Sequence, residues 1–138
     1  MVKKKLFDKC VGLLEESGLG ENAVCEVTWV FEDVAGGEDI TPEQEKRISD
    51  IVTRRCEGYP LQYLLGQWEF YGLPFKVGEG VLIPRQDTET IVDTALKMFA
   101  GKKDITVIDL CSGSGCIGIT LERKLDCGRA VCVAVSYT

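Results

Sequence analysis

The sequence predicts an α+β chain in two parts: an all-helical bundle over residues 1–67 and the start of a strand-and-helix domain over 87–138, joined by a β-hairpin linker over 68–86. Three observations support this prediction. Apolar residues recur at helical spacing in the first half. Aromatic and β-branched runs, broken by glycine and proline, follow from Trp68. The chain then shows an apolar strand, a small-residue turn, a helix and a second apolar strand, an order typical of a parallel βαβ unit.

Three longer helices and one short helix are expected in the first part. Apolar side chains at helical spacing predict helices over residues 3–17 and 21–35. The third helix has Thr41 as its N-cap and Pro42 in its first position, and Thr41 with Gln44 fits a capping box. The segment PLQYLLG predicts the short helix, with a proline near its start and a glycine after its end.

The second part begins after a hairpin in which the residues 72–74, Gly-Leu-Pro, are expected to form the turn. We read the hairpin as a linker rather than a core element. The helix that follows has Asp87 as its expected N-cap. A buried strand, a helix and a second buried strand are then expected over residues 105–110, 115–125 and 129–135.

Composition excludes several classes of function. The net charge of −6 repels phosphate backbones, so we expect no direct nucleic-acid partner. A chain without histidine holds no Ser-His-Asp triad and no Cys-His pair. Its seven cysteines, with no Cys-x-x-Cys, are typical of free thiols in a reducing compartment, and predict a cytoplasmic protein. No apolar run reaches the ~18 residues of a membrane span, and no signal peptide is recognisable, so we expect no membrane partner.

A metal site is disfavoured for a related reason. Four cysteines in the last third are close enough in sequence to be considered as ligands: Cys111, Cys116, Cys127 and Cys132. The first two fall in the predicted turn and helix, where another role is expected for them. We therefore expect no metal.

The turn after the first buried strand carries the strongest chemical signal. Gly113, Gly115 and Gly118 fit the pattern G-x-G-x-x-G between a strand and a helix, which is the dinucleotide-binding fingerprint. Glycines let the backbone approach a ligand closely, and the amides at the helix start face a polar or anionic group.

Three interpretations of this turn remain open from the residues alone. Asp109 at the strand end would repel the pyrophosphate of NAD but suits a cationic group, such as the ammonium and sulfonium of S-adenosylmethionine. Ala134 stands where a carboxylate for the ribose would be expected, about 20 residues on, which weakens both ligand readings. A tight turn without any ligand is the third interpretation. The residues favour the methyltransferase reading.

Three longer blocks resemble one family. They are LQYLLGQWEFYG, VLIPRQDTE and DLCSGSGCI, and together they closely resemble the HemK family, the bacterial N(5)-glutamine methyltransferases of peptide chain release factors. The resemblance implies a helical release-factor-binding domain, a hairpin, and a class I (Rossmann-like) domain that binds S-adenosyl-L-methionine. The implied reaction methylates the side-chain amide of a glutamine in the Gly-Gly-Gln motif of release factors, in translation termination. We expect the protein to be a monomer.

The resemblance also implies which residues hold the cofactor. Asp109 would face its methionine end, and Arg85 lies in the linker motif beside the pocket, where a surface cation on a rigid turn is an equal alternative. The loop around the cofactor would be Cys111, Ser112, Gly113, Ser114 and Gly115.

The chain departs from the family pattern in ways that affect function. The family's Asn-Pro-Pro-Tyr motif, which holds the glutamine, is absent from these 138 residues, so we expect a C-terminally truncated chain without catalytic residues that is inactive alone. Ala134 replaces the family's aspartate, and Cys111 replaces a glycine at a cost of about 1 kcal/mol if the position needs a positive φ. The alternative functions are a non-catalytic release-factor-binding module and, less favoured, an NAD-type domain.

Overall fold

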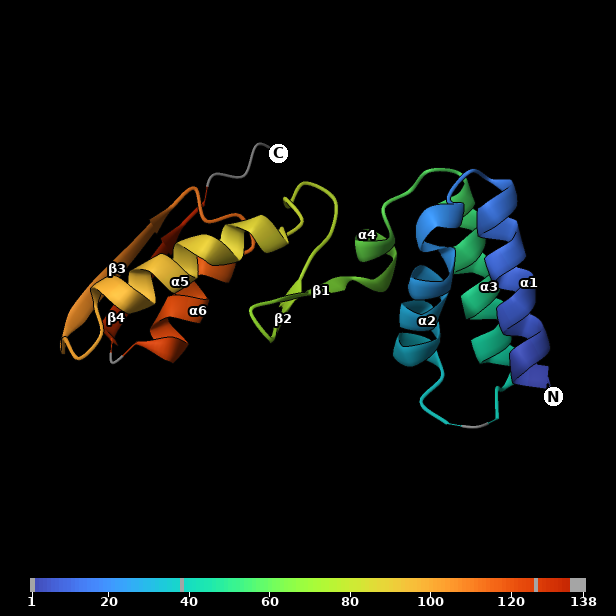
Figure 1. The fold of residues 1–138 in the computed structure, drawn as a ribbon, viewed down its shortest axis with the longest axis horizontal. Coiled ribbons are helices and arrows are strands. Elements are labelled where there is room, and N and C mark those ends of the chain that lie inside the picture. Colours follow the sequence, from blue (N-terminus) through green and yellow to red (C-terminus); the bar gives the residue numbers. More distant parts are fainter. Residues whose placement is uncertain (1, 38, 126, 135–138) are drawn as a thin grey trace. The chain divides into compact units, whose positions relative to one another are not determined.

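A computed structural model describes residues 2–37, 39–125 and 127–134, and it mixes helices with two small sheets (Figure 1). The chain divides into two compact units, Met1–Leu65 and Gly66–Thr138. Each unit has its own hydrophobic core. In the described part of the chain, every helix is too short or too polar to cross a bilayer.

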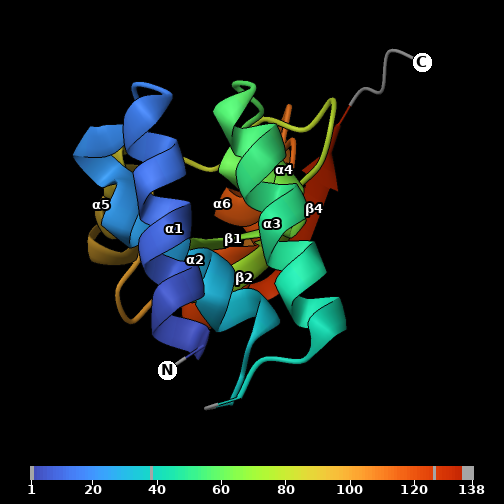
Figure 2. The same cartoon turned by 90° about the vertical axis from the view of Figure 1, so that its right-hand side faces the viewer.

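The first unit is helical. Its elements are α1 (Val2–Glu16), a 3₁₀ turn (Gly20–Asn22), α2 (Ala23–Val34), α3 (Pro42–Cys56) and the short α4 (Leu61–Leu65). Helices α1, α2 and α3 pack against one another, as Figures 1 and 2 show. Their apolar stripes meet in a core in which Leu14, Val27 and Ile48 are fully buried. The expected helical bundle is therefore present over these residues.

The start of α3 is fixed by the capping box that the sequence predicts. The backbone N–H of Gln44 donates to Thr41 Oγ1 at 3.2 Å, and the backbone N–H of Thr41 donates to Gln44 Oε1 at 2.9 Å. The amide of Gln44 also donates to the carbonyl of Val34 at 3.0 Å, at the end of α2. One side chain thus satisfies orphan backbone groups of two helices.

An ion pair joins the other end of α3 to α2. The guanidinium of Arg55 donates two hydrogen bonds to Glu26, from Nε to Oε2 at 2.6 Å and from Nη2 to Oε1 at 2.9 Å. Both side chains are largely buried, with 19% and 12% of their surface exposed. The hydrogen bond from Arg55 to Glu26 raises the pKa of the guanidinium. This two-point contact fixes the packing of α3 on α2.

The second unit opens with an antiparallel hairpin of β1 (Gln67–Phe70) and β2 (Leu73–Lys76). The turn lies at Tyr71 and Gly72, with φ of 53° and 72°, which is the pattern of a type I′ turn. We expected the turn at residues 72–74, and this prediction was wrong. The observed turn begins one residue earlier and ends two residues earlier. Leu73 and Pro74 belong to β2, because a type I′ turn at Tyr71 and Gly72 matches the right-handed twist of the flanking strands.

The hairpin is part of the second core rather than a bare linker. Phe70 is 1% exposed and packs edge-to-face with Phe75, with ring centroids 6.2 Å apart. Both rings lie in one cluster with Val92 and Leu121. Our reading of the hairpin as a linker missed this, because alternation in so short a strand does not reveal what its buried face meets.

Helix α5 (Glu89–Met98) begins later than expected. Residues Gln86–Thr88 form a 3₁₀ turn, and Thr88 rather than Asp87 is the N-cap, with no side-chain cap hydrogen bond. The prediction of Asp87 as N-cap was therefore wrong. The carboxylate of Glu89 instead accepts from the backbone N–H of Tyr71 at 2.7 Å, which ties the hairpin tip to α5.

The remaining elements form a parallel βαβ unit, as predicted. They are β3 (Ile105–Leu110), α6 (Cys116–Lys124) and β4 (Cys127–Val133), and β3 pairs with β4 in parallel. Helix α6 packs on both strands and α5 packs beside α6 (Figure 1). Strand β4 begins two residues before its predicted start and ends at Val133; the predicted last residue, 135, lies outside the described residues.

Candidate functional site

The turn between β3 and α6 is built from left-handed backbone. Cys111, Gly113 and Gly115 have φ of 62°, 55° and 75°. Glycine adopts this region freely, whereas a side chain there costs about 1 kcal/mol or more. The condition under which the sequence predicted a cost at Cys111, a positive φ, is met, so this cysteine adds strain to the turn.

Backbone hydrogen bonds fix the turn to its neighbours. The N–H of Ser112 donates to the carbonyl of Val133 on β4 at 3.0 Å. The N–H of Gly115 donates to Ser112 at 2.8 Å, and that of Ile119 donates to Gly115 at 2.9 Å to begin α6. The turn is therefore tied to the end of β4 on one side and to the helix on the other, at the carboxyl edge of the sheet.

Asp109 caps α6 from the end of β3. Its Oδ2 accepts a hydrogen bond from the backbone N–H of Gly118 at 2.9 Å. Gly115, the N-cap residue, has no side chain with which to do this. A carboxylate at the positive end of a helix is also favoured by the helix dipole. The sequence placed Asp109 at the site but did not predict this second function, which uses one of its two oxygens.

Gly118 is required by close packing between α6 and the strands. A Cβ at this position would lie 2.7 Å from Cys132 Sγ and 3.0 Å from Asp109 Cβ. A side chain there would force a shift in the strand residues or in the helix. The third glycine of the fingerprint thus serves helix–strand packing, which is the role that the third glycine has in dinucleotide-binding turns.

Cys132 belongs to the site, although sequence reasoning did not assign it a role. It pairs in register with Asp109, and its sulfur lies under α6 at Gly118. The residue as a whole is exposed, but the partial desolvation of its sulfur under α6, followed by the charges of Asp109 and Glu122, raises the pKa of the Cys132 thiol. The register of the two strands, which would have revealed it, is not readable from one sequence.

The other predicted residues are placed as follows. Ser112 and Ser114 are half-buried in the turn. Arg85 is exposed and its carbonyl accepts from the N–H of Thr88 at 3.0 Å; no described contact joins its side chain to the glycine turn. Ala134 is exposed directly after β4. The structure brings together Asp109 and residues 111–115.

The arrangement of Asp109 and the turn has a defined chemical capacity. It offers a carboxylate with one oxygen left over from capping, beside left-handed backbone that can approach a ligand without side-chain obstruction. This suits a cationic or hydroxyl-bearing ligand group better than a polyanion. Within the described ranges, no three Cys, Asp or Glu side chains gather where they could hold a metal ion.

Comparison with known proteins finds similarity to one group of proteins over much of the chain. The sequence profile of the PrmC N-terminal domain matches residues 24–66. The chain is 37% identical over 131 residues to the release factor glutamine methyltransferase of Fusobacterium nucleatum subsp. nucleatum, with 87% of this chain and 37% of that protein covered. It is 37% identical over 143 residues to the protein of the same name from Geobacter sulfurreducens, with 96% and 49% covered. For that of Bacillus cereus the values are 39% over 121 residues, with 80% and 43% covered.

The chain thus has a helical first part, followed by a part in which a glycine turn joins a strand of a small parallel sheet to the next helix. More specifically, the chain is a homologue of the release factor glutamine methyltransferases, as the sequence motifs predicted. It spans between 37% and 49% of the length of the three relatives described above.

Proposed function

We propose that this chain is part of an S-adenosylmethionine-dependent methyltransferase that acts on the side-chain amide of a glutamine in release factors. The names of its relatives support the reaction and the substrate. The observation that carries the cofactor assignment is the position of Asp109. This residue lies next to the last residue of β3, and its carboxylate accepts a hydrogen bond from the N–H of Gly118. On this proposal, residues 87–138 are the start of a Rossmann-like methyltransferase domain.

The site favours S-adenosylmethionine over NAD. A carboxylate at the strand end would repel a pyrophosphate but attract the ammonium of a methionine moiety. Asp109 keeps one oxygen for that group, and residues 111–115 would lie along the rest of the cofactor. When bound, S-adenosylmethionine supplies an electrophilic methyl group. Asp109 and residues 111–115 would hold and orient that cofactor. Arg85 is proposed to lie beside the cofactor pocket.

The reacting glutamine would be held by residues other than those of this sequence. The Asn-Pro-Pro-Tyr motif that serves this purpose in the family does not occur in it. We therefore assign no catalytic residue here and expect little or no methyl transfer by this chain alone. Residues 1–67 would bind the release factor and 68–86 would join the two parts.

A second candidate is a release-factor-binding module without catalysis. It is favoured by a cleft of about 680 Å³ in the helical unit, on α1 and α2. Phe7 and Phe31, with ring centroids 5.2 Å apart, are among its apolar lining residues, and Lys3, Lys4 and Glu32 are among its charged ones. An apolar cleft with charged sides is suited to a protein partner.

Transfer of a radioactive methyl group to a release factor tests both candidates. The chain is assayed alone and after mixing with the remaining part of the Geobacter sulfurreducens relative. Methylation only in the mixture supports the first proposal. Binding of the release factor without methylation in either sample supports the second. Binding of NAD in preference to S-adenosylhomocysteine would contradict both the cofactor assignment and the reaction.

A further inference from the structure

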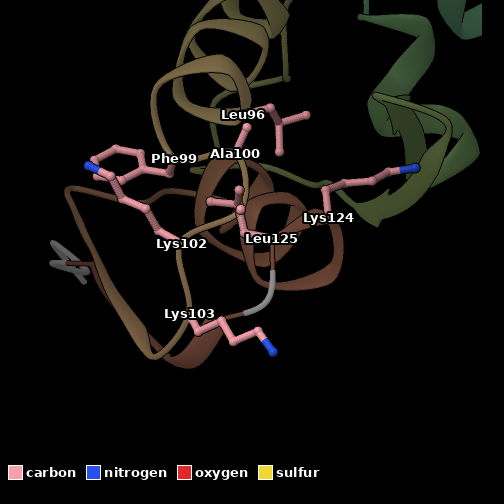
Figure 3. Close-up of a pocket in the computed structure, with 8 residues that line it drawn as sticks. Leu96, Phe99, Ala100, Lys102, Lys103, Lys124 and Leu125 are labelled. Atoms are coloured by element: carbon pink, nitrogen blue, oxygen red, sulfur yellow. The ribbon is translucent and has the colours of Figure 1, made fainter.

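A cleft of about 360 Å³ lies at the far end of α6 from the glycine turn (Figure 3). The last turn of α5, the residues that follow it and the end of α6 line this cleft. Leu96, Phe99 and Leu125 supply apolar surface, and Lys102, Lys103 and Lys124 supply its charge. We call it the lysine-rimmed cleft. It lies within the second unit and shares no residue with the site at Asp109.

The charge of this cleft is opposite to that of the whole chain. Three of the eight lining residues are lysines and none is an acid, although the chain has 22 acidic and 16 basic residues. Asp104 follows Lys103 in sequence but does not line the cleft. A local positive surface on an acidic protein attracts an acidic ligand to one place and disfavours it elsewhere.

The lysines do not converge on one point. In Figure 3 the ammonium groups of Lys102, Lys103 and Lys124 point in different directions. Lys102 Nζ lies 5.0 Å from the ring centroid of Phe99, and Lys124 Nζ lies 5.8 Å from that of Tyr71. Because the ammonium groups diverge, a ligand with several separate negative charges suits them better than a single phosphate does.

The apolar part of the cleft decides between two kinds of acidic ligand. A nucleic-acid strand would need an open aromatic face on which to stack its bases, and Lys102 already lies over the ring of Phe99. A peptide with apolar side chains between its carboxylates matches both the apolar lining residues of the cleft and its lysines.

We propose that the lysine-rimmed cleft docks an acidic, amphipathic peptide segment of a partner protein. Its apolar side chains would lie against Leu96 and Leu125, and its carboxylates would pair with the lysines at the rim. This inference does not depend on the proposed methyl transfer, because the cleft and the glycine turn are at opposite ends of α6.

Fluorescence anisotropy on the full chain tests the proposal. The probe is a short labelled peptide in which leucines alternate with pairs of glutamates. We expect saturable binding that is roughly three- to tenfold weaker in Lys103→Gln/Lys124→Gln, because each exposed ion pair contributes little. Both lysines are exposed, so the double variant is expected to fold, which circular dichroism checks. Lys97→Gln is the matched control, since Lys97 is exposed on α5 but does not line the cleft.

Two further probes separate the alternatives. A peptide in which serines replace the leucines is expected to bind at least several-fold more weakly, and oligouridylate is expected not to compete. The proposal is overturned if the leucine peptide does not bind, if the double variant binds as the Lys97 control does, or if the serine peptide binds equally well. Stronger binding of oligouridylate would assign the cleft to nucleic acid instead.

Discussion

Asp109 Oδ2 lies 2.9 Å from the backbone nitrogen of Gly118 and accepts its hydrogen bond, so the last acid of β3 caps the helix that follows the glycine turn. The same glycine leaves no room for a Cβ beside Asp109 and Cys132. The cap of α6, the glycine turn and the contact of α6 with β3 and β4 therefore depend on one another. The positions of the Asp109 carboxylate and of the turn backbone, which a ligand would meet, depend on all three.

The contact between α6 and β4 predicts a coupled pair of substitutions. Gly118→Ala is expected to destabilise the second unit by about 1–3 kcal/mol, because its Cβ would lie 2.7 Å from Cys132 Sγ. Cys132→Ala in the same chain removes that sulfur and should recover much of the loss. Urea unfolding of the two single variants and the double variant gives the coupling energy. Gly12→Ala on α1 is the control, since nothing lies within 4 Å of its Cβ; additive effects at 118 and 132 would refute the contact.

The left-handed backbone at Cys111 predicts a graded series. Cys111→Gly removes a side chain from φ of 62° and is expected to leave stability unchanged or to raise it by up to about 1 kcal/mol. Cys111→Val is expected to cost about 1–2 kcal/mol, because β-branched residues avoid this region most strongly. Thermal unfolding of both variants measures the order. If valine is tolerated as well as glycine is, the turn does not have this conformation.

The ion pair in the helical unit is expected to matter more than a surface pair. Arg55→Met leaves Glu26 unpaired in a site where only 12% of that side chain is exposed, and should cost about 1–3 kcal/mol. Arg47→Met is the matched control, because Arg47 is 62% exposed and lies 3.6 Å from Asp33; it should cost no more than about 1 kcal/mol. Since Glu26 raises the pKa of Arg55, the guanidinium's part of this stabilisation should persist through neutral and mildly alkaline pH and be lost as the pH rises beyond arginine's usual range. Equal losses in the two variants would contradict the burial of the first pair.

We expect the chain to self-associate through the exposed apolar side chains on one face of the small sheet. Ile108 and Leu110 are 63% and 71% exposed on β3, where one face lacks cover in the described structure. Ile108→Ser/Leu110→Ser should reduce light scattering in concentrated samples and change the free energy of unfolding little. Val92→Ser, at a fully buried position, should instead destabilise the unit by about 2–4 kcal/mol. Unchanged scattering in the β3 variant would show that this face is not the one that associates.

Much of this architecture was readable from local signals. The box at Thr41 and Gln44 fixes the start of a helix through chemistry three residues apart, and the structure confirms it. The parallel pairing of β3 and β4 follows from two apolar runs around a helix, and it is also confirmed. Such features depend on neighbours along the chain, which a single sequence displays.

The errors concern contacts between distant residues. Asp87 has the chemistry of an N-cap, but Glu89 contacts the backbone of Tyr71, 18 positions earlier, and the helix begins after a 3₁₀ turn. Phe70 and Phe75 were assigned to a linker, although they pack on Val92. The place of Cys132 beside Asp109 depends on strand register. Tertiary packing decided each of these features, and local pattern does not contain it.

The most direct test of the account is calorimetric titration of the chain with S-adenosylhomocysteine. We expect saturable heat from the native sequence and about tenfold weaker binding in Asp109→Asn, which keeps an acceptor for the N–H of Gly118 but loses the charge. Ala134→Asp should tighten binding about ten- to a hundredfold, because it restores an acceptor for the ribose hydroxyls at the end of β4. Binding that both variants leave unchanged, or no heat from any of the three chains, would contradict a cofactor site at this turn.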